Sequence, residues 1–326
     1  KQLQDTSLRF HSTFLNNSLT AAVLGEINCQ SPFYRTYTSE TQRTQILHDI
    51  SFTLYRGEIL GLVGESGSGK STLARAVLGM ESDVTGTVTH HTKRPQMVFQ
   101  DPAGSLNPAF TVAQTLAEPL RIYGKYDKAG IESRVRDTMA LVGLDESYYD
   151  RYPHELSGGM MQRFSIVLSL MFNPDLLIMD EATTALDVVT QGQLLREIMK
   201  LEAGLNLTRI MITHDLSVVA SACRKTLVLY SGQVMEFGTV EQVIKQHLHP
   251  YTEGLIRSFP SLYGEKQALR GIPGSLPDLT DPPAGCVFAP RCPYATERCR
   301  QERPQVREYE PGHFAACHRC QEREAE

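Results

Sequence analysis

The sequence predicts an α/β protein, because short apolar runs that suit buried strands alternate with stretches of helical periodicity. Three runs carry this prediction, at Ile59–Val63, Leu176–Asp180 and Thr208–Thr213, and polar residues suited to chemistry follow each of them. The segment Ser71–Leu78 comes soon after the first run and has the pattern of a helix. At 326 residues the chain is long enough for one large domain with an appendage, or for two domains.

The loop between the first strand and its helix, Gly64–Thr72, has the order Gly, four residues, Gly-Lys-Ser. This order is typical of loops that hold nucleotide phosphates on backbone N–H groups, aided by the positive end of the following helix. Lys70 can reach the outer phosphates, and the Ser71 hydroxyl can ligate Mg²⁺. A glycine-rich turn without a ligand is the alternative, which the strand, loop and helix order disfavours. The candidate nucleotide-binding residues here are Gly64, Ser66, Gly67, Ser68, Gly69, Lys70, Ser71 and Thr72.

Charge and apolar pattern exclude some classes of protein. The net charge of −5 gives no general attraction to nucleic acid or anionic lipid, so we expect no nucleic-acid partner. No apolar run approaches the roughly 20 residues that span a bilayer. The longest run, Ile166–Phe172, fits a helix segment, and Leu19–Leu24 is too short and lacks the basic flank of a secretory signal.

The first part of the chain, residues 1–25, shows no clean periodicity, and its role stays open. Ile50–Leu54 alternates like a half-buried strand and leads toward the phosphate loop. An aromatic side chain ahead of this segment could stack on an adenine ring, although packing at a domain edge explains such a residue equally well. The candidates are Tyr34, which we favour, Phe33 and Tyr37.

Two further strands are expected at Gly86–Thr89 and Gln96–Phe99, and Gln100 ends the second of them. A Gln at a strand end can place its amide oxygen on Mg²⁺ or on an attacking water, and the loop behind it can move when that contact changes. Alone, such a Gln is more often a surface residue, so its role depends on the other groups. Residues 111–150 have helical periodicity, with apolar positions at Val112, Leu116, Leu120, Val135, Met139 and Val142.

A second candidate anion site is Leu156–Met160, which opens a helix through Phe172. Gly158 and Gly159 expose backbone amides at the helix N-terminus, and Ser157 adds a hydroxyl. An ordinary helix cap is the alternative. Because the chain already has one complete phosphate loop, we expect this second site to serve a nucleotide held by another subunit.

Two carboxylates end the strand at 176–180. Asp180 can orient Mg²⁺, and Glu181 is placed to polarise a water for in-line attack on the γ-phosphate. A buried strand that ends in two carboxylates is costly without a metal or another partner, which argues against a purely structural role. His214 follows the strand at 208–213 and can hydrogen-bond the γ-phosphate or the water, although a lone His in such a place is usually not catalytic.

These motifs, in this order, resemble the ATPase subunits of ATP-binding cassette (ABC) transporters over roughly residues 26–260. The resemblance implies a P-loop NTPase fold of the ABC nucleotide-binding type, with a RecA-like core, a small antiparallel β-subdomain and a helical subdomain. It implies an N-terminal segment at 1–25, an ABC ATPase domain at 26–255 and a cysteine-rich C-terminal extension at 256–326. The matching motifs are Walker A at Gly64–Ser71, the Q-loop residue Gln100, the signature Leu156–Met160, Walker B at Leu176–Asp180 with catalytic Glu181, the D-loop Ala185–Asp187 and the switch His214.

Finer features are similar to the oligopeptide/dipeptide/nickel importer group. They include Gln100–Pro108, Asp180–Asp187, His249–Thr252, Ile272–Pro277 and Gly285–Pro293. The resemblance implies a second, paralogous ABC ATPase, two transmembrane permease subunits and an extracytoplasmic substrate-binding protein. It also implies a peripheral location on the cytoplasmic face of the cell (inner) membrane.

Five of the seven cysteines crowd into the C-terminal extension. Cys286, Cys292, Cys299 and Cys317 are separated by five, six and seventeen residues, and four thiolates can hold Zn²⁺ or a [4Fe–4S] cluster. Structural zinc usually takes ligands as two close pairs, so the wide spacing and the family resemblance favour the cluster. Zinc and the absence of any metal stay open. Cys320 is expected to be spare, with His313 and His318 as weaker ligand candidates.

The predicted function is ATP hydrolysis that drives uptake of peptides through an ABC importer, with ATP, Mg²⁺ and a [4Fe–4S] cluster as cofactors. Nickel chelates or another small solute are alternative cargoes. A rival of another class is a soluble ABC ATPase that acts outside transport, but such proteins usually carry two cassettes or long coiled-coil insertions, and neither is evident here.

Overall fold

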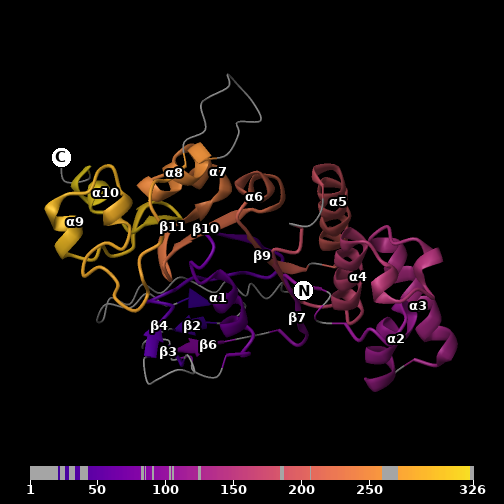
Figure 1. The fold of residues 1–326 in the computed structure, drawn as a ribbon. Coiled ribbons are helices and arrows are strands. Elements are labelled where there is room, and N and C mark those ends of the chain that lie inside the picture. The colour runs from indigo at the N-terminus through magenta and orange to yellow at the C-terminus, as the bar shows by residue number, and fades with distance from the viewer. Residues whose placement is uncertain are drawn as a thin grey trace, which may run out of the picture. The chain divides into compact units, whose positions relative to one another are not determined.

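The computed structural model describes residues 21–22, 26–28, 34–36 and 43–323, apart from 82–83, 85, 90–91, 103, 105, 124–125, 184–186, 206 and 259–270. The chain divides into two compact units. Unit 1 comprises residues 1–55, 60–91 and 213–326, and unit 2 comprises residues 56–59 and 92–212. Figure 1 labels the helices and strands of both.

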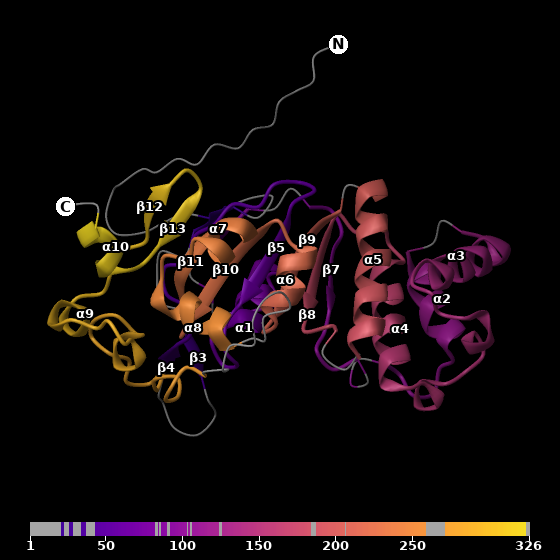
Figure 2. The same cartoon turned by 90° about the horizontal axis from the view of Figure 1, so that it is seen from above.

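The main sheet of unit 1 is organised around β5, whose five residues are all buried. β5 pairs in parallel with β10, which places Leu62 beside Leu227 and Val63 beside Val228. The pairs β10–β11, β11–β13 and β13–β12 are antiparallel, and Figure 2 shows β13 and β12 continuing the sheet beyond β11. These strands are β5 (Ile59–Val63), β10 (Lys225–Tyr230), β11 (Gln233–Thr239), β13 (His313–Ala315) and β12 (Arg307–Glu310).

The core of unit 1 joins three distant parts of the chain. The rings of Tyr230, Tyr251 and Phe288 pack together with centroid distances of 4.7 to 5.3 Å. These residues come from β10, from α8 and from the segment before a 3₁₀ helix at Ala289–Arg291. The C-terminal segment therefore supplies part of the core of this unit. The helices of unit 1 are α1 (Lys70–Val77), α6 (Leu216–Ala222), α7 (Val240–Lys245), α8 (Pro250–Ser258), α9 (Glu297–Gln301) and α10 (His318–Arg323).

Unit 1 also contains two small antiparallel sheets. One has the strand order β1–β2–β6, and the other is the pair β3–β4. The predicted strand at 50–54 is wrong, because only Leu54 makes a strand-like bridge. Ile50, Phe52 and Thr53 are all buried, so this segment lacks the polar face that the prediction assumed. The strand bounds are β1 (Ala21–Ala22), β2 (Glu26–Asn28), β6 (Thr87–Val88), β3 (Tyr34–Thr36) and β4 (Arg43–Gln45).

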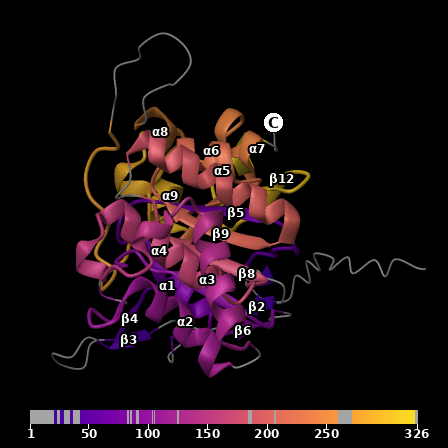
Figure 3. The same cartoon turned by 90° about the vertical axis from the view of Figure 1, so that its right-hand side faces the viewer.

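Unit 2 combines a parallel sheet with a group of helices. The strand β8 lies between β7 and β9 in parallel register, and all five of its residues are buried. Figure 3 shows α2, α3 and α4 gathered together, and two 3₁₀ helices, at Glu146–Tyr148 and Pro153–Glu155, connect α3 to α4. The elements are β7 (Pro95–Val98), β8 (Leu176–Asp180), β9 (Thr208–Thr213), α2 (Val112–Ile122), α3 (Lys128–Leu141), α4 (Gly158–Leu170) and α5 (Val188–Leu205).

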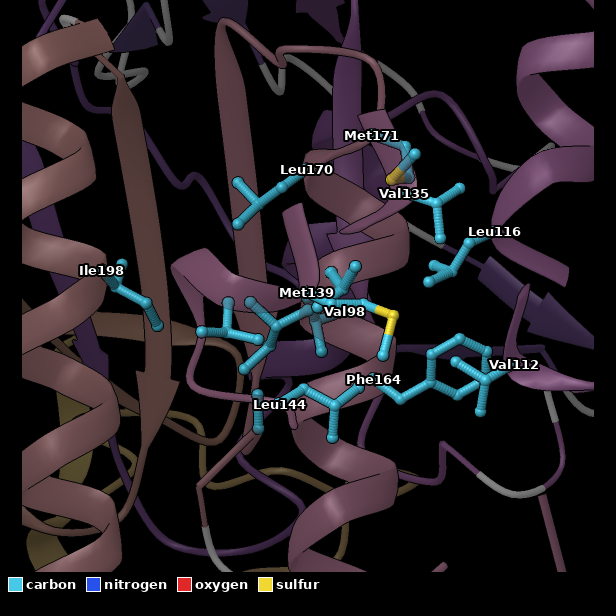
Figure 4. Close-up of a cluster of buried hydrophobic side chains, with 14 of the residues drawn as sticks. Val98, Val112, Leu116, Val135, Met139, Leu144, Phe164, Leu170, Met171 and Ile198 are labelled. Carbon is cyan, nitrogen blue, oxygen red and sulfur yellow. The ribbon is translucent and has the colours of Figure 1, made fainter. Parts of the chain in front are cut away.

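The helical periodicity predicted for residues 111–150 is confirmed. All six predicted apolar positions are buried, and Figure 4 shows several of them around Phe164 of α4. Among the helices that the structure describes, none is both long enough and apolar enough to cross a membrane.

A buried polar network ties β13 of unit 1 to β11. The Nε2 atom of His313 lies 2.8 Å from the carboxylate of Glu236, and the backbone N–H groups of Leu248 and His249 donate to the same carboxylate at 2.9 Å. The Nδ1 atom of His249 accepts a hydrogen bond from the backbone N–H of Tyr251 at 3.0 Å. Burial lowers the pKa of His249 from 6.5 to about 4, outweighing the nearby charge of Glu236.

This pKa predicts that unfolding becomes easier as the pH falls from 6.5 toward 4. Over that range the unfolded state binds a proton at His249 that the folded state does not, so the contribution vanishes above pH 6.5 and reaches about 2 kcal/mol at pH 5. Urea unfolding at several pH values would measure it. His249→Gln should flatten the curve, whereas His154→Gln, at an exposed histidine, should not. Identical curves for the parent and His249→Gln would contradict the assignment.

Candidate functional site

The Gly64–Thr72 loop of unit 1 connects β5 directly to α1. Lys70, the first residue of α1, turns its side chain back over the loop and is only 5% exposed. Its Nζ donates to the carbonyl oxygens of Gly64 at 2.8 Å and Glu65 at 2.7 Å. The ammonium group thus lies at the concave side of the loop, where the sequence predicts the phosphates.

The glycines of this loop are required by its geometry. Gly67 and Gly69 have φ angles of 80° and 96°, in the left-handed region that favours glycine. A Cβ atom on Gly64 would lie 2.1 Å from the carbonyl oxygen of Leu229, so β10 leaves no room for a side chain.

The start of α1 fits an anion. Gly69 is the N-cap and offers no side chain to bond the first N–H groups of the helix. Those amides, the Lys70 ammonium and the Ser71 hydroxyl form a donor set that fits a nucleotide triphosphate with its Mg²⁺.

The carboxylates of unit 2 lie where β8 ends. Asp180 is 4% exposed as the last residue of β8. Glu181 follows with a φ of 47°, a strained conformation for a non-glycine residue, and its N–H donates to Ile212 at 3.0 Å. The side-chain amide of Gln100 donates to the Glu181 carboxylate at 3.3 Å. The structure thus brings together two predicted site residues that lie 81 positions apart.

Ser157 is the N-cap of α4, as its helix-cap alternative predicts. Its hydroxyl accepts a hydrogen bond from the N–H of Met160 at 3.4 Å. Gly158 begins the helix, and a Cβ added there would meet nothing within 4 Å. Ser157 and Gly158 are exposed, so this helix start is open on its outer side.

His214, Asp187 and the backbone of Tyr34 also lie within the described parts of the chain. His214 is exposed between β9 and α6, and Asp187 caps α5 by accepting from the N–H groups of Val189 and Thr190. Tyr34 lies in β3 opposite Gln45. The side chain of Tyr34, the residues Phe33 and Tyr37, and the D-loop residues 185 and 186 lie outside the described parts.

Sequence reasoning missed three residues that meet at the phosphate loop. The N–H of Glu65 donates to the Tyr251 hydroxyl at 2.9 Å, and Arg291 forms an ion pair with the Glu65 carboxylate at 2.9 Å. These partners lie 186 and 226 positions away, so no local periodicity connects them. The only sequence signal for Tyr251 and Arg291 was that they lie in His249–Thr252 and Gly285–Pro293, two segments that are similar to the importer group.

The cysteines of the C-terminal segment gather in unit 1. Cys286, Cys292 and Cys299 border the same buried cluster, and all are free thiols. Burial, with smaller effects from the charges of the other three, raises the pKa of Cys286 to about 12. A hydrogen bond from Cys320 is the main cause that lowers the pKa of Cys317 to about 6. Within the described ranges, however, no three His, Cys, Asp or Glu side chains are arranged to hold a metal ion, so the predicted iron–sulfur site is not supported by the geometry.

Comparisons with known proteins agree with the motif order. Residues 47–184 match the family model for ABC transporters, and residues 235–299 match the model for the oligopeptide/dipeptide transporter C-terminal region. The dipeptide transport ATP-binding protein DppD of Haemophilus influenzae is 40% identical over 279 residues, which cover 79% of this chain and 84% of that protein. DppD of Escherichia coli is 38% identical over 291 residues, which cover 82% of this chain and 89% of that protein.

The chain belongs to the ATP-binding subunits of oligopeptide/dipeptide ABC transporters. It is an ABC-type ATPase. A dimeric bacterial ABC transporter cassette of known structure has the same fold, with a TM-score of 0.59 and 24% identity over 66% of this chain and 97% of that chain. The predicted P-loop NTPase fold is therefore confirmed.

Gly64→Ala should destabilise the phosphate loop and reduce ATPase activity at least about tenfold, because the new methyl group would collide with the backbone of β10. Thermal unfolding and phosphate release measure the two effects. Gly192→Ala is the matched control, since a Cβ there would meet only the end of the Arg196 side chain, at 3.6 Å. Normal activity and stability of Gly64→Ala would show that the loop has a different geometry.

Proposed function

We propose that this ABC ATPase hydrolyses ATP to drive peptide uptake through a membrane importer. The observation that carries the proposal is the phosphate loop with the buried Lys70 ammonium at its concave side. The similarity to two proteins named as dipeptide transport subunits supports peptides as the cargo.

The predicted motif residues divide the chemistry of this proposal among them. The loop amides, Lys70 and Ser71 would hold the triphosphate of Mg-ATP, and Asp180 and Gln100 would serve as further ligands of Mg²⁺. When bound there, Mg²⁺ would supply positive charge that stabilises the negative charge developing on the phosphates. Glu181 accepts a proton from the attacking water. The left-handed backbone of Glu181 and the hydrogen bond from Gln100 help to orient its carboxylate.

The remaining predicted residues fit the same reaction. His214 contacts the γ-phosphate or the water and thereby distinguishes ATP from ADP. Tyr34 stacks on the adenine ring. The open helix start at Ser157, Gly158 and Gly159 binds the triphosphate held by a second, paralogous ATPase, so two chains close around two nucleotides.

Such a pair works with partners that this chain does not contain. Two transmembrane permease subunits form the path for the peptide, and an extracytoplasmic binding protein delivers it. The chain itself acts peripherally on the cytoplasmic face of the inner membrane. ATP binding favours the closed pair, and hydrolysis resets it.

Glu181→Gln should lower the rate of hydrolysis at least about 100-fold while Mg-ATP still binds, because the amide cannot accept the proton of the water. Phosphate release and nucleotide binding by the purified chain with its partner subunits measure this. Glu197→Gln is the control, since Glu197 is a surface residue that pairs only with exposed Lys200 among the described side chains. Turnover of Glu181→Gln at the parent rate would remove Glu181 from the reaction.

Uptake in cells decides the cargo and separates transport from a soluble role. Cells that carry Glu181→Gln should lose uptake of a labelled dipeptide, and permease subunits should co-purify with the chain from membranes. Loss of nickel uptake with intact dipeptide uptake would favour the nickel alternative. Absence of permease subunits after gentle purification would favour an ABC ATPase that acts outside transport.

We also propose that Cys286, Cys292, Cys299 and Cys317 hold a [4Fe–4S] cluster, with Zn²⁺ as the alternative. Their spacing and the mutual influence of their charges support this, and the absence of a metal-binding arrangement in the described residues speaks against it. Ligation would therefore need a rearrangement of these side chains. A bound cluster would stabilise the C-terminal segment.

Chain purified without air should contain iron and sulfide and absorb visible light as iron–sulfur proteins do. Cys286→Ser should lose the iron, whereas Cys223→Ser, at a cysteine far from this segment in the sequence, should keep it. Zinc in place of iron would select the alternative. Chain without either metal would refute the proposal.

A further inference from the structure

Glu65, the second residue of the phosphate loop, is held through three of its polar groups. Its carbonyl oxygen accepts a hydrogen bond from Lys70, and its N–H donates to the hydroxyl of Tyr251. Its carboxylate accepts a hydrogen bond from Nη1 of Arg291 at 2.9 Å. Lys70 belongs to the loop itself, but Tyr251 and Arg291 come from the C-terminal part of the chain. The position of this peptide therefore depends on residues far from the loop in sequence.

Arg291 is built into its surroundings. Its side chain is 6% exposed, and each of its three nitrogen atoms is a donor. The Nη1 atom donates hydrogen bonds to the Glu65 carboxylate at 2.9 Å and to the Tyr230 hydroxyl at 3.2 Å. The Nε atom donates to the carbonyl oxygen of Pro273 at 2.7 Å, and Nη2 donates to that of Ile272 at 3.2 Å. Such a planar fork with several fixed partners holds its carboxylate in one orientation. Arg291 therefore joins the loop, the end of β10 and the segment at 271–277.

The charge of Arg291 matters because Glu65 lies beside the expected phosphates. One carboxylate oxygen of Glu65, Oε1, is buried with no hydrogen-bond partner among the described residues. Arg291 is the cation that the structure pairs with this carboxylate. Without it, a carboxylate whose side chain is 28% exposed would remain unneutralised in the loop and repel an incoming triphosphate.

We propose that Arg291 and Tyr251 position the phosphate loop through Glu65, so that the C-terminal region sets the affinity of the chain for Mg-ATP. The inference rests on the proposed role of the Gly64–Thr72 loop in holding the triphosphate. Arg291 and Tyr251 touch no reacting atom, so they are positioning residues.

The same contacts connect the phosphate loop to the cysteine segment, residues 286–320. Arg291 immediately precedes Cys292, and the 3₁₀ helix at 289–291 begins beside Phe288, which packs on Tyr251 at 5.3 Å. The segment at 271–277 also lies close to the phosphate loop, because a Cβ on Gly67 would lie 3.5 Å from a methyl carbon of Leu276. A rearrangement of the cysteine segment would therefore move Arg291 relative to Glu65 and change the affinity for Mg-ATP.

The test measures binding of a fluorescent ATP analogue with Mg²⁺ to the full chain. Arg291→Ala should raise the dissociation constant at least about tenfold, and Arg291→Lys, which keeps the charge without the fork, should have an intermediate effect. Tyr251→Phe should raise it a few-fold, because the Glu65 N–H loses its acceptor. The matched controls are Arg257→Ala, in a surface pair with Glu253, and Tyr123→Phe, at a tyrosine that is 75% exposed.

Removing the negative charge of Glu65 together with the positive charge of Arg291 gives a result that a merely structural role would not produce. If Arg291 acts through Glu65, Glu65→Gln combined with Arg291→Gln should bind Mg-ATP within about threefold of Glu65→Gln alone. Additive effects of the two substitutions would overturn the proposal. In the assembled transporter, Arg291→Lys should raise KM for ATP more than it lowers kcat, and the opposite split would also contradict it.

Circular dichroism and thermal unfolding verify that each variant is folded. If Arg291→Ala is unfolded, Arg291→Lys with and without Glu65→Gln gives the same comparison. Lys70→Ala separates the two levels of inference. If it binds Mg-ATP like the parent, the proposed role of the loop fails; if it loses binding while Arg291→Lys and Tyr251→Phe match the parent, only the positioning role fails.

Discussion

The ammonium group of Lys70 donates hydrogen bonds to two backbone carbonyls of a glycine-rich loop. This arrangement requires a buried strand before the loop, a helix that starts without a side-chain cap, and a backbone that approaches β10 too closely for a Cβ at Gly64. A buried cation needs such partners, because burial away from water is costly for a charge. Much of unit 1 can be understood as the support that holds these carbonyls in place.

The C-terminal segment is part of that support. Phe288 enters the aromatic cluster of Tyr230 and Tyr251, and Arg291 neutralises a carboxylate on the loop. The buried pair of Glu236 and His313 fastens β13 to β11. The segment that a sequence boundary at 255 separates from the ATPase domain is thus packed into the same core as the phosphate loop.

The chemistry that depends on adjacent residues could be predicted from the sequence. The loop at 64–72, the strand that ends at Asp180 and the apolar positions of α2 and α3 follow from local spacing, and the structure has them where expected. The left-handed backbone of Glu181 could not be predicted, because hydrogen bonds outside its own strand hold it. The contacts of Glu65 with Tyr251 and Arg291 were equally out of reach, since they join segments about two hundred residues apart. The irregular segment at 50–54 was mistaken for a strand because burial of Thr53 is a tertiary effect.

The order of the two units along the chain has a consequence for synthesis. Apart from four residues, unit 2 is one continuous stretch from 92 to 212, so its sheet and helices can form as soon as that stretch leaves the ribosome. Unit 1 begins before this stretch and ends after it, and its core joins Val63 to Phe288. The phosphate loop is therefore translated early but supported late, because its partners Tyr251 and Arg291 emerge only after all of unit 2.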